Sequence, residues 1–257
     1  MSRAETSFLF TPLRIGKIEL KNRLALMPIT TMLDGNDEIT DKYVRFFEAR
    51  ARGGVGILFT GKMSVISTRD ATIRWPGIYD EKFIPGMKRL TDAIHSHHVP
   101  VIAQVGLAGL IHQWRTSYSA PLEAVAPSPP PIFKKTIPRE LSVPEIKRIV
   151  EQFGEAVALA KEGGFDGVDI LACQGSLINR FLSPLTNRRT DEYGGSLDNR
   201  MRMLIEIIGT AKKKVGDDFV LSCRLSVDEL MEGGLTTPDY LPICAVLEKA
   251  GVHCLNV

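Results

Sequence analysis

The chain has 257 residues, of which 44% are hydrophobic and 24% are charged, so it is long enough to bury one large core as a single domain. Its formal net charge is only +2, with Lys and Arg spread along the chain, which argues against nucleic acid or a membrane surface as a partner. The N-terminal segment MSRAETSFLF lacks the apolar centre of a signal peptide, and no apolar run approaches the ~18 residues that span a bilayer. We therefore expect a cytoplasmic protein that binds a small molecule.

The expected strands are short apolar runs. Residues 8–23 alternate apolar and polar side chains around Gly16, which predicts an N-terminal β-hairpin. Further runs alternate with longer segments of helical period, as in a parallel sheet wrapped by helices. These runs lack strict alternation, as strands covered on both faces do. We predict strands that start at Leu24, Gly56, Val101, Gly167, Val220 and Cys254.

The helices between these strands have recognisable ends. The clearest is predicted over residues 143–162, where Ser142 and Glu145 have the spacing of a capping box. Ser196 is expected to cap another helix over residues 197–215. Three more helices are predicted, over residues 40–52, 84–97 and 238–250.

Six strand–helix starts in this order predict an α/β fold, a (β/α)8 TIM barrel of which about six βα units are present. We expect one barrel domain over residues 1–257, with the hairpin closing its bottom. An open six-stranded barrel would expose two sheet edges. We therefore interpret the chain as truncated after its sixth strand and as a fragment of a longer protein.

No metal site is predicted. The histidines within residues 95–98 fall at the end of a predicted helix, where cationic side chains are stabilising without a metal. The cysteines show no CxxC spacing, so neither a zinc nor an iron–sulfur site is expected within the chain. We expect four free thiols, largely buried: Cys173, Cys223, Cys244 and Cys254.

The loop after the fourth predicted strand carries a family resemblance. It reads INRFLSPLTNRRTDEYGGSLDNRMR. Together with LKNRLALMPIT near the start and CRLS at the end of strand five, it resembles the old yellow enzyme family of FMN-dependent oxidoreductases, over residues 8–257. In that family the loop braces the barrel mouth, which implies a structural polar network for Arg188, Arg189, Asp191 and Arg200.

The resemblance also implies a flavin site. It places Thr30 as a donor to the O4 and N5 edge of the ring, and Gln104 at the O2 and N3 edge. Arg224 falls against N1 and O2, where a cation stabilises the negative charge of the reduced flavin. Lys62 stands where relatives carry a small residue. The implied cofactor-binding set is Pro28, Ile29, Thr30, Lys62, Gln104 and Arg224.

The expected substrate side departs from the family pattern. Leu171 and Gln174 replace the pair that holds the substrate carbonyl, and Ser176 replaces the proton-donating tyrosine. A serine hydroxyl is a far weaker acid than a phenol, whose pKa is about 10. We expect Gln174 to polarise the carbonyl, and Leu171 and His112 to contact the substrate. His112 or Tyr118 is a further candidate for the proton donor.

The resemblance implies hydride transfer from reduced FMN to the activated C=C bond of an unsaturated carbonyl compound or acyl thioester, with NADH or NADPH as reductant. The loop is also similar to the enoate and 2,4-dienoyl-CoA reductase branch, whose iron–sulfur cluster and FAD are implied only if the protein extends beyond Val257. Two alternatives stay open: a catalytically silent flavin-binding or interaction protein, and an aldolase or lyase with Lys62 as Schiff-base amine. The substrate, the preferred nicotinamide and any homo-oligomer also stay open.

Overall fold

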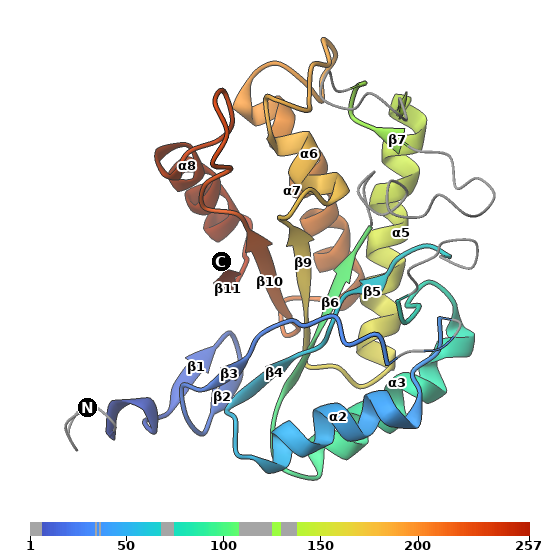
Figure 1. The fold of residues 1–257 in the computed structure, drawn as a ribbon, viewed down its shortest axis with the longest axis vertical. Helices are drawn as coiled ribbons and strands as arrows, with labels where there is room; N and C mark the ends of the chain where they lie inside the picture. The colour runs from blue at the N-terminus through green and yellow to red at the C-terminus, as the bar shows by residue number, and fades with distance from the viewer. Residues whose placement is uncertain (1–6, 34, 36, 68–74, 108–124, 130–137) are drawn as a thin grey trace.

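The computed structural model describes residues 7–33, 35, 37–67, 75–107, 125–129 and 138–257. Its main sheet is parallel, in the order β11-β10-β9-β6-β4-β3, with β5 (Met63–Ser64) added beside β6. The six predicted strands are confirmed as β3 (Ala25–Leu26), β4 (Ile57–Phe59), β6 (Val101–Gly106), β9 (Gly167–Ala172), β10 (Val220–Leu225) and β11 (Cys254–Asn256). The sheet curves into a half-barrel with helices along its outer face (Figure 1).

The helices follow the predicted caps closely. The Ser142 backbone N–H donates to Glu145 Oε2 at 2.8 Å, as the capping box requires, and Ser196 Oγ accepts from the backbone N–H of Asn199 at 3.3 Å. One short helix, α6 (Leu177–Leu182), was not predicted, because fewer than two turns leave no periodic pattern. The predicted helices are α2 (Asp41–Arg52), α3 (Ile84–His95), α5 (Val143–Glu162), α7 (Leu197–Val215) and α8 (Thr237–Lys249).

The N-terminal hairpin consists of β1 (Leu13–Ile15) and β2 (Ile18–Leu20), joined at Gly16, whose φ of 56° suits glycine. Its apolar side chains form a small cluster together with side chains from the inner face of the sheet. That cluster contains Leu20, Ile57, Phe59, Ile102 and Val220. The hairpin therefore covers the amino-terminal end of the half-barrel and leaves the carboxyl ends of the strands open for a site.

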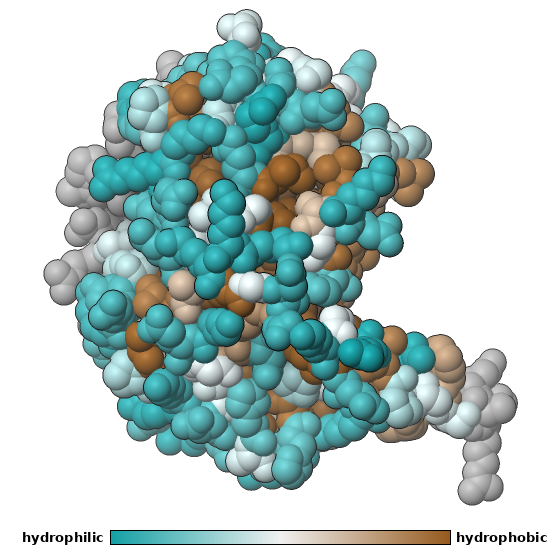
Figure 2. All heavy atoms as spheres, turned by 180° about the vertical axis from the view of Figure 1, so that it is seen from behind, coloured by the Kyte–Doolittle hydropathy of each residue, from teal (hydrophilic) through white to brown (hydrophobic). Residues whose placement is uncertain are grey.

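The two ends of the sheet are β3 and β11, and neither pairs with a further strand among the described residues. Apolar side chains near these ends are exposed, including Ile29 (48%) and Val257 (72%). Seen from behind, the outline of the molecule is notched between the region of α8 and the N-terminal hairpin (Figure 2). An incomplete barrel explains this exposure, because a closed sheet would cover both edges.

The polar loop after β9 is the predicted structural brace. Arg189 is 6% exposed and binds both carboxylate oxygens of Asp191, with Nε at 3.0 Å and Nη2 at 2.5 Å. Its Nη1 atom also donates to the carbonyls of Pro127 and Leu141, at 2.8 and 2.6 Å. The guanidinium therefore joins three segments that are distant in sequence, which confirms the structural interpretation of Arg189 and Asp191.

The two flanking arginines of the brace differ from each other. Arg200 Nε donates to the carbonyl of Leu182 at 2.8 Å, as a member of the predicted network. Among the described residues, Arg188 contributes its backbone N–H, which donates to Ser128 Oγ at 2.9 Å, while its side chain is exposed. Within the described residues the Arg188 side chain therefore adds no hydrogen bond to the brace, in contrast to Arg189.

Within the described residues, none of the helices is both long and apolar enough to cross a bilayer.

Candidate functional site

Three central strands present polar side chains to the interior of the half-barrel. The register pairs Gln104 of β6 with Asp169 of β9, and Asp169 with Ser222 of β10. Two residues further along, Leu171 pairs with Arg224. Because alternate residues of a strand share a face, these side chains form two layers above the apolar floor that the hairpin covers. The layers lie toward the carboxyl ends of the strands, where barrel sites occur.

Asp169 is the centre of the lower layer and is fully buried. Its Oδ2 atom accepts from Gln104 Nε2 at 2.8 Å and from Asn256 Nδ2 at 3.2 Å, and its Oδ1 atom accepts from Ser222 Oγ at 2.7 Å. Burial raises the pKa of the Asp169 carboxyl, while these hydrogen bonds and the charge of Arg224 act against the rise. A carboxylate in the middle of an apolar strand was the signal that sequence reasoning missed.

Gln104 and Arg224 each have a side-chain polar group without a hydrogen-bond partner among the described residues. Gln104 is 3% exposed, and its backbone N–H donates to Thr60 Oγ1 at 3.1 Å. Its side-chain N–H group is taken up by Asp169, whereas its carbonyl oxygen accepts no hydrogen bond from the residues that the structure describes. Arg224 is half-buried, and its guanidinium likewise binds no described hydrogen-bond partner. A buried acceptor and a cation are thus both available to a ligand.

The segment after β3 lies beside the end of β4. A Cβ atom added to Gly61 would lie 2.4 Å from the carbonyl oxygen of Ile29, so the two backbones touch and only glycine fits. Pro28 is half-buried, while Ile29 and Thr30 are exposed. Thr30 is therefore an exposed residue of the segment whose Ile29 carbonyl lies against Gly61, one residue before Lys62.

Lys62 lies on the inner side of the sheet with 7% of its surface exposed. A Cβ atom added to Gly106 would lie 3.3 Å from Lys62 Cδ and 3.0 Å from Leu171 Cβ, so both side chains fill the space beside this glycine. The Lys62 ammonium lies 3.3 Å from the centroid of the Trp75 ring. Burial lowers the pKa of Lys62 to about 7. The aliphatic part of the Lys62 side chain and the Leu171 side chain form an apolar surface above the layer that contains Gln104.

Gln174 and Ser176 occupy different surroundings. Gln174 has a φ of 54° and an exposed side chain, and it lines a hollow of about 350 Å³ together with Ser226 and Glu229. Ser176 is 6% exposed, its Oγ donates to the carbonyl of Leu171 at 3.0 Å, and it accepts from the Asn179 backbone at 3.4 Å. The serine caps α6, so its hydroxyl is held by backbone groups. A role of Ser176 in proton transfer stays a prediction.

The remaining candidates contribute little to the site. His112 and Tyr118 lie outside the described residues. Cys173 is buried, which raises the pKa of its thiol to about 11 and disfavours a reactive thiolate. No group of three or more His, Cys, Asp or Glu side chains within the described ranges is placed to hold a metal ion.

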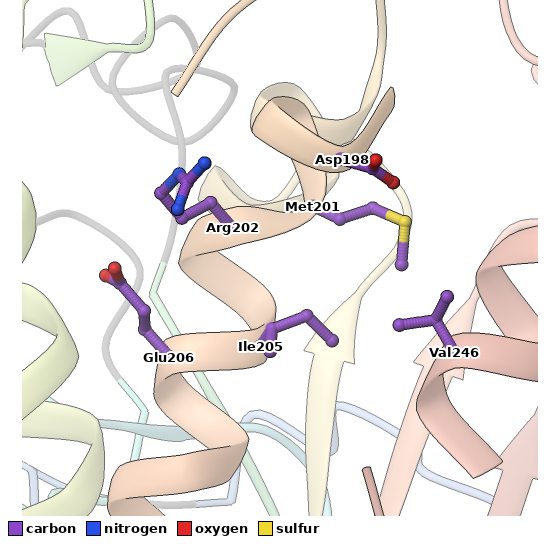
Figure 3. A pocket seen from close by; sticks show the side chains of 6 residues that line it. All are labelled: Asp198, Met201, Arg202, Ile205, Glu206 and Val246. Atoms are coloured by element: carbon purple, nitrogen blue, oxygen red, sulfur yellow. The ribbon is translucent and has the colours of Figure 1, made fainter. Parts of the chain in front are cut away.

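A second hollow, of about 300 Å³, lies between α7 and α8 (Figure 3). The Met201 thioether points toward Val246 across it, and Glu206 at its side is paired with Lys147 at 2.6 Å. Its lining comes from the two helices, so it is separate from the polar layers at the strand ends. The lining residues are Asp198, Met201, Arg202, Ile205, Glu206 and Val246.

The chain matches a known protein family and known proteins. Residues 8–256 match the model of the NADH:flavin oxidoreductase / NADH oxidase family. The chain is 38% identical over 252 residues to a metal reductase of Desulforamulus reducens (strain ATCC BAA-1160 / DSM 100696 / MI-1), a match that covers 98% of the chain and 37% of that protein. It is also 38% identical over 252 residues to an NADH oxidase of Thermoanaerobacter brockii, across 97% of the chain and 38% of the relative.

A solved structure of a 2-naphthoyl-CoA reductase in complex with 2-naphthoyl-CoA superposes with a TM-score of 0.89 at 31% identity. The match covers 97% of the chain and 40% of that protein. The chain thus spans about two fifths of the length of these relatives.

Proposed function

Because the chain belongs to the NADH:flavin oxidoreductase / NADH oxidase family, we propose that it forms the FMN-binding part of an oxidoreductase that reduces the activated C=C bond of an unsaturated carbonyl compound or acyl thioester. The observation that carries this proposal is the pair of open polar groups in adjoining layers, the Gln104 carbonyl oxygen and the Arg224 guanidinium. Family membership leaves the aldolase or lyase alternative, which rests on Lys62 alone, without support.

The described residues fit a flavin ring. The pyrimidine part of the ring presents an N–H donor between two carbonyls, which complements a buried acceptor and a nearby cation. Gln104 supplies the acceptor, and Arg224 supplies a positive charge that favours the anionic reduced ring. Thr30, with Pro28 and Ile29, lies in the exposed segment after β3, where its hydroxyl is a candidate donor to the ring. Bound FMN would supply hydride transfer between a nicotinamide and the substrate.

On the substrate side, Leu171 and the Lys62 stem offer apolar surface beside Gly106. This surface suits a substrate with an apolar body more than one with many polar groups. We propose that Gln174 polarises the substrate carbonyl, with the exposed amide as donor. Replacement of Gln174 by Ala should then lower kcat/KM with little effect on FMN affinity, and unchanged turnover would argue against this role.

The relatives support the choice of reductant and substrate class. The name NADH oxidase supports a nicotinamide electron donor, and the complex of 2-naphthoyl-CoA reductase with its thioester supports an acyl thioester substrate. Because the relatives are longer than this chain, an iron–sulfur cluster and FAD remain part of the proposal only for a protein that extends beyond Val257.

The first experiment is an absorbance titration of the protein with FMN, followed by assays of NADH and NADPH oxidation with an enone and an enoyl thioester. We expect saturable binding, weakened at least about tenfold by Gln104→Ala or Arg224→Ala. Arg188→Ala is the matched control, since that side chain is exposed in the brace. Lack of binding by the wild-type protein contradicts the proposal. Binding without any reductase activity supports the silent flavin-binding alternative.

A further inference from the structure

Asp169 holds two side-chain amides at once. Its Oδ2 atom accepts from Gln104 Nε2 at 2.8 Å and from Asn256 Nδ2 at 3.2 Å. The amides come from β6 and β11, on either side of the β9 strand that carries Asp169 in Figure 1. A single buried oxygen therefore determines the direction of both amide groups.

The chemistry of the carboxylate selects one amide orientation. Asp169 accepts hydrogen bonds from Gln104, Asn256 and Ser222, as an ionised carboxylate does, so each amide turns its NH2 group toward Asp169 and its carbonyl oxygen away. A reversed Gln104 amide would bring two oxygens together and leave its NH2 group without this acceptor. The Asn256 amide has the same orientation: its Nδ2 atom donates to Asp169, and its buried Oδ1 atom has no hydrogen-bond partner among the described residues.

We infer that Asp169 is a positioning residue for the flavin site: it holds the Gln104 carbonyl oxygen toward the ligand and so makes the site selective for a ring that presents an N–H at this edge. The inference rests on the proposed function. It assigns to Asp169 a role beyond stability, because a purely structural hydrogen bond would not affect which ring the site prefers.

The test compares FMN with FMN methylated at N3, which lacks the N–H donor. Wild-type protein should bind FMN at least about tenfold more tightly, since the methyl group leaves the Gln104 oxygen unpaired. Asp169→Leu removes the acceptor at similar size, so the Gln104 amide is free to turn and the preference should fall below about threefold. Flavin fluorescence quenching gives both dissociation constants.

Asp169→Asn is the matched control. Its side-chain oxygen still accepts from the two amides, and its new NH2 group donates to the Ser222 hydroxyl, which also accepts hydrogen bonds. The variant loses the negative charge but keeps the acceptor, so we expect it to keep the wild-type preference. Equal loss of preference in Asp169→Asn and Asp169→Leu would show that charge matters rather than amide orientation, and would overturn the inference.

A double-mutant cycle tests whether Asp169 acts through Gln104. In a Gln104→Ala background, Asp169→Leu should cause no further change in the preference between the two flavins. A wild-type protein that binds neither flavin overturns the proposed function and this inference with it. FMN binding with an unchanged preference in Asp169→Leu overturns this inference alone.

One measurement does not depend on a folded Asp169→Leu variant or on bound flavin. In the ligand-free wild-type protein, NMR of the Gln104 side-chain amide should show one proton that exchanges slowly with water, because Asp169 holds it in a buried hydrogen bond. Rapid exchange of both protons would show a freely turning amide and would contradict the inference.

Discussion

The Lys62 ammonium lies 3.3 Å from the centroid of the Trp75 ring, and both side chains are almost fully buried. Burial lowers the pKa of Lys62 to about 7, because desolvation disfavours the charged ammonium. A buried cation without a carboxylate among its described contacts costs stability. Because Lys62 lies beside the proposed flavin site, we infer that a functional role of this lysine offsets its cost in stability.

Replacement of Lys62 by Met should therefore stabilise the fold at neutral pH by on the order of 2 kcal/mol, after allowance for the lost contact with Trp75. The folded-state pKa lies below the unfolded value, so stability from this group rises as the pH increases from about 7 to about 10.5. The advantage of the variant should shrink over that range. Urea unfolding at several pH values measures it, and a pH-independent difference would contradict the prediction.

Gly61 is predicted to tolerate no side chain. Its Cβ would lie 2.4 Å from the Ile29 carbonyl oxygen, so Gly61→Ala must push the segment after β3 away from β4. We expect a loss of roughly 1 to 3 kcal/mol and weaker FMN binding through Thr30. Gly209 in α7 is the control, because a Cβ there meets nothing within 4 Å and Gly209→Ala should stabilise the helix by about 0.5 to 1 kcal/mol. Equal effects in the two variants would argue against the backbone contact.

The brace provides a third prediction. Arg189→Met leaves the Asp191 carboxylate and two backbone carbonyls without their donor, so we expect roughly 3 to 5 kcal/mol of destabilisation. Arg188→Met, one residue earlier, should change stability by less than about 0.5 kcal/mol because its side chain is exposed. Chemical unfolding of both variants measures the difference. Similar stability in the two would show that the Arg189 contacts contribute little.

The pair formed by His95 and Asp166 predicts a pH dependence. His95 Nε2 lies 2.8 Å from Asp166 Oδ2, and this hydrogen bond raises the pKa of His95 above its ordinary value. The resulting stability is fully present below the unfolded pKa of about 6.5 and is lost as the pH rises through the higher folded value.

His95→Gln should therefore lose stability relative to wild type at about pH 5.5, and lose less at about pH 8.5. His98→Asn, at an exposed position, is the control variant. Unfolding midpoints at the two pH values report both. A pH-independent effect of His95→Gln would show that the ion pair contributes nothing.

The sequence by itself determined the six main strands and the five long helices of this fold. Apolar runs and capping residues such as Ser142 and Ser196 act over a few residues, so their effects can be recognised without a structure. The same holds for Gln104 and Arg224, which follow from their positions near the ends of predicted strands and from the family resemblance. Their open carbonyl and guanidinium groups agree with the flavin contacts that the resemblance implies, which remain a proposal.

The tertiary structure alone decided which polar groups meet. Asp169 contacts residues 65, 53 and 87 positions away in the sequence, so nothing local revealed it as the centre of the interior network. Ser176 became a helix cap because the chain turns sharply there, and Arg188 turned outward where Arg189 turned inward. Local patterns reflect the period and caps of each element, whereas hydrogen bonds between strands depend on register and curvature that only the assembled sheet provides.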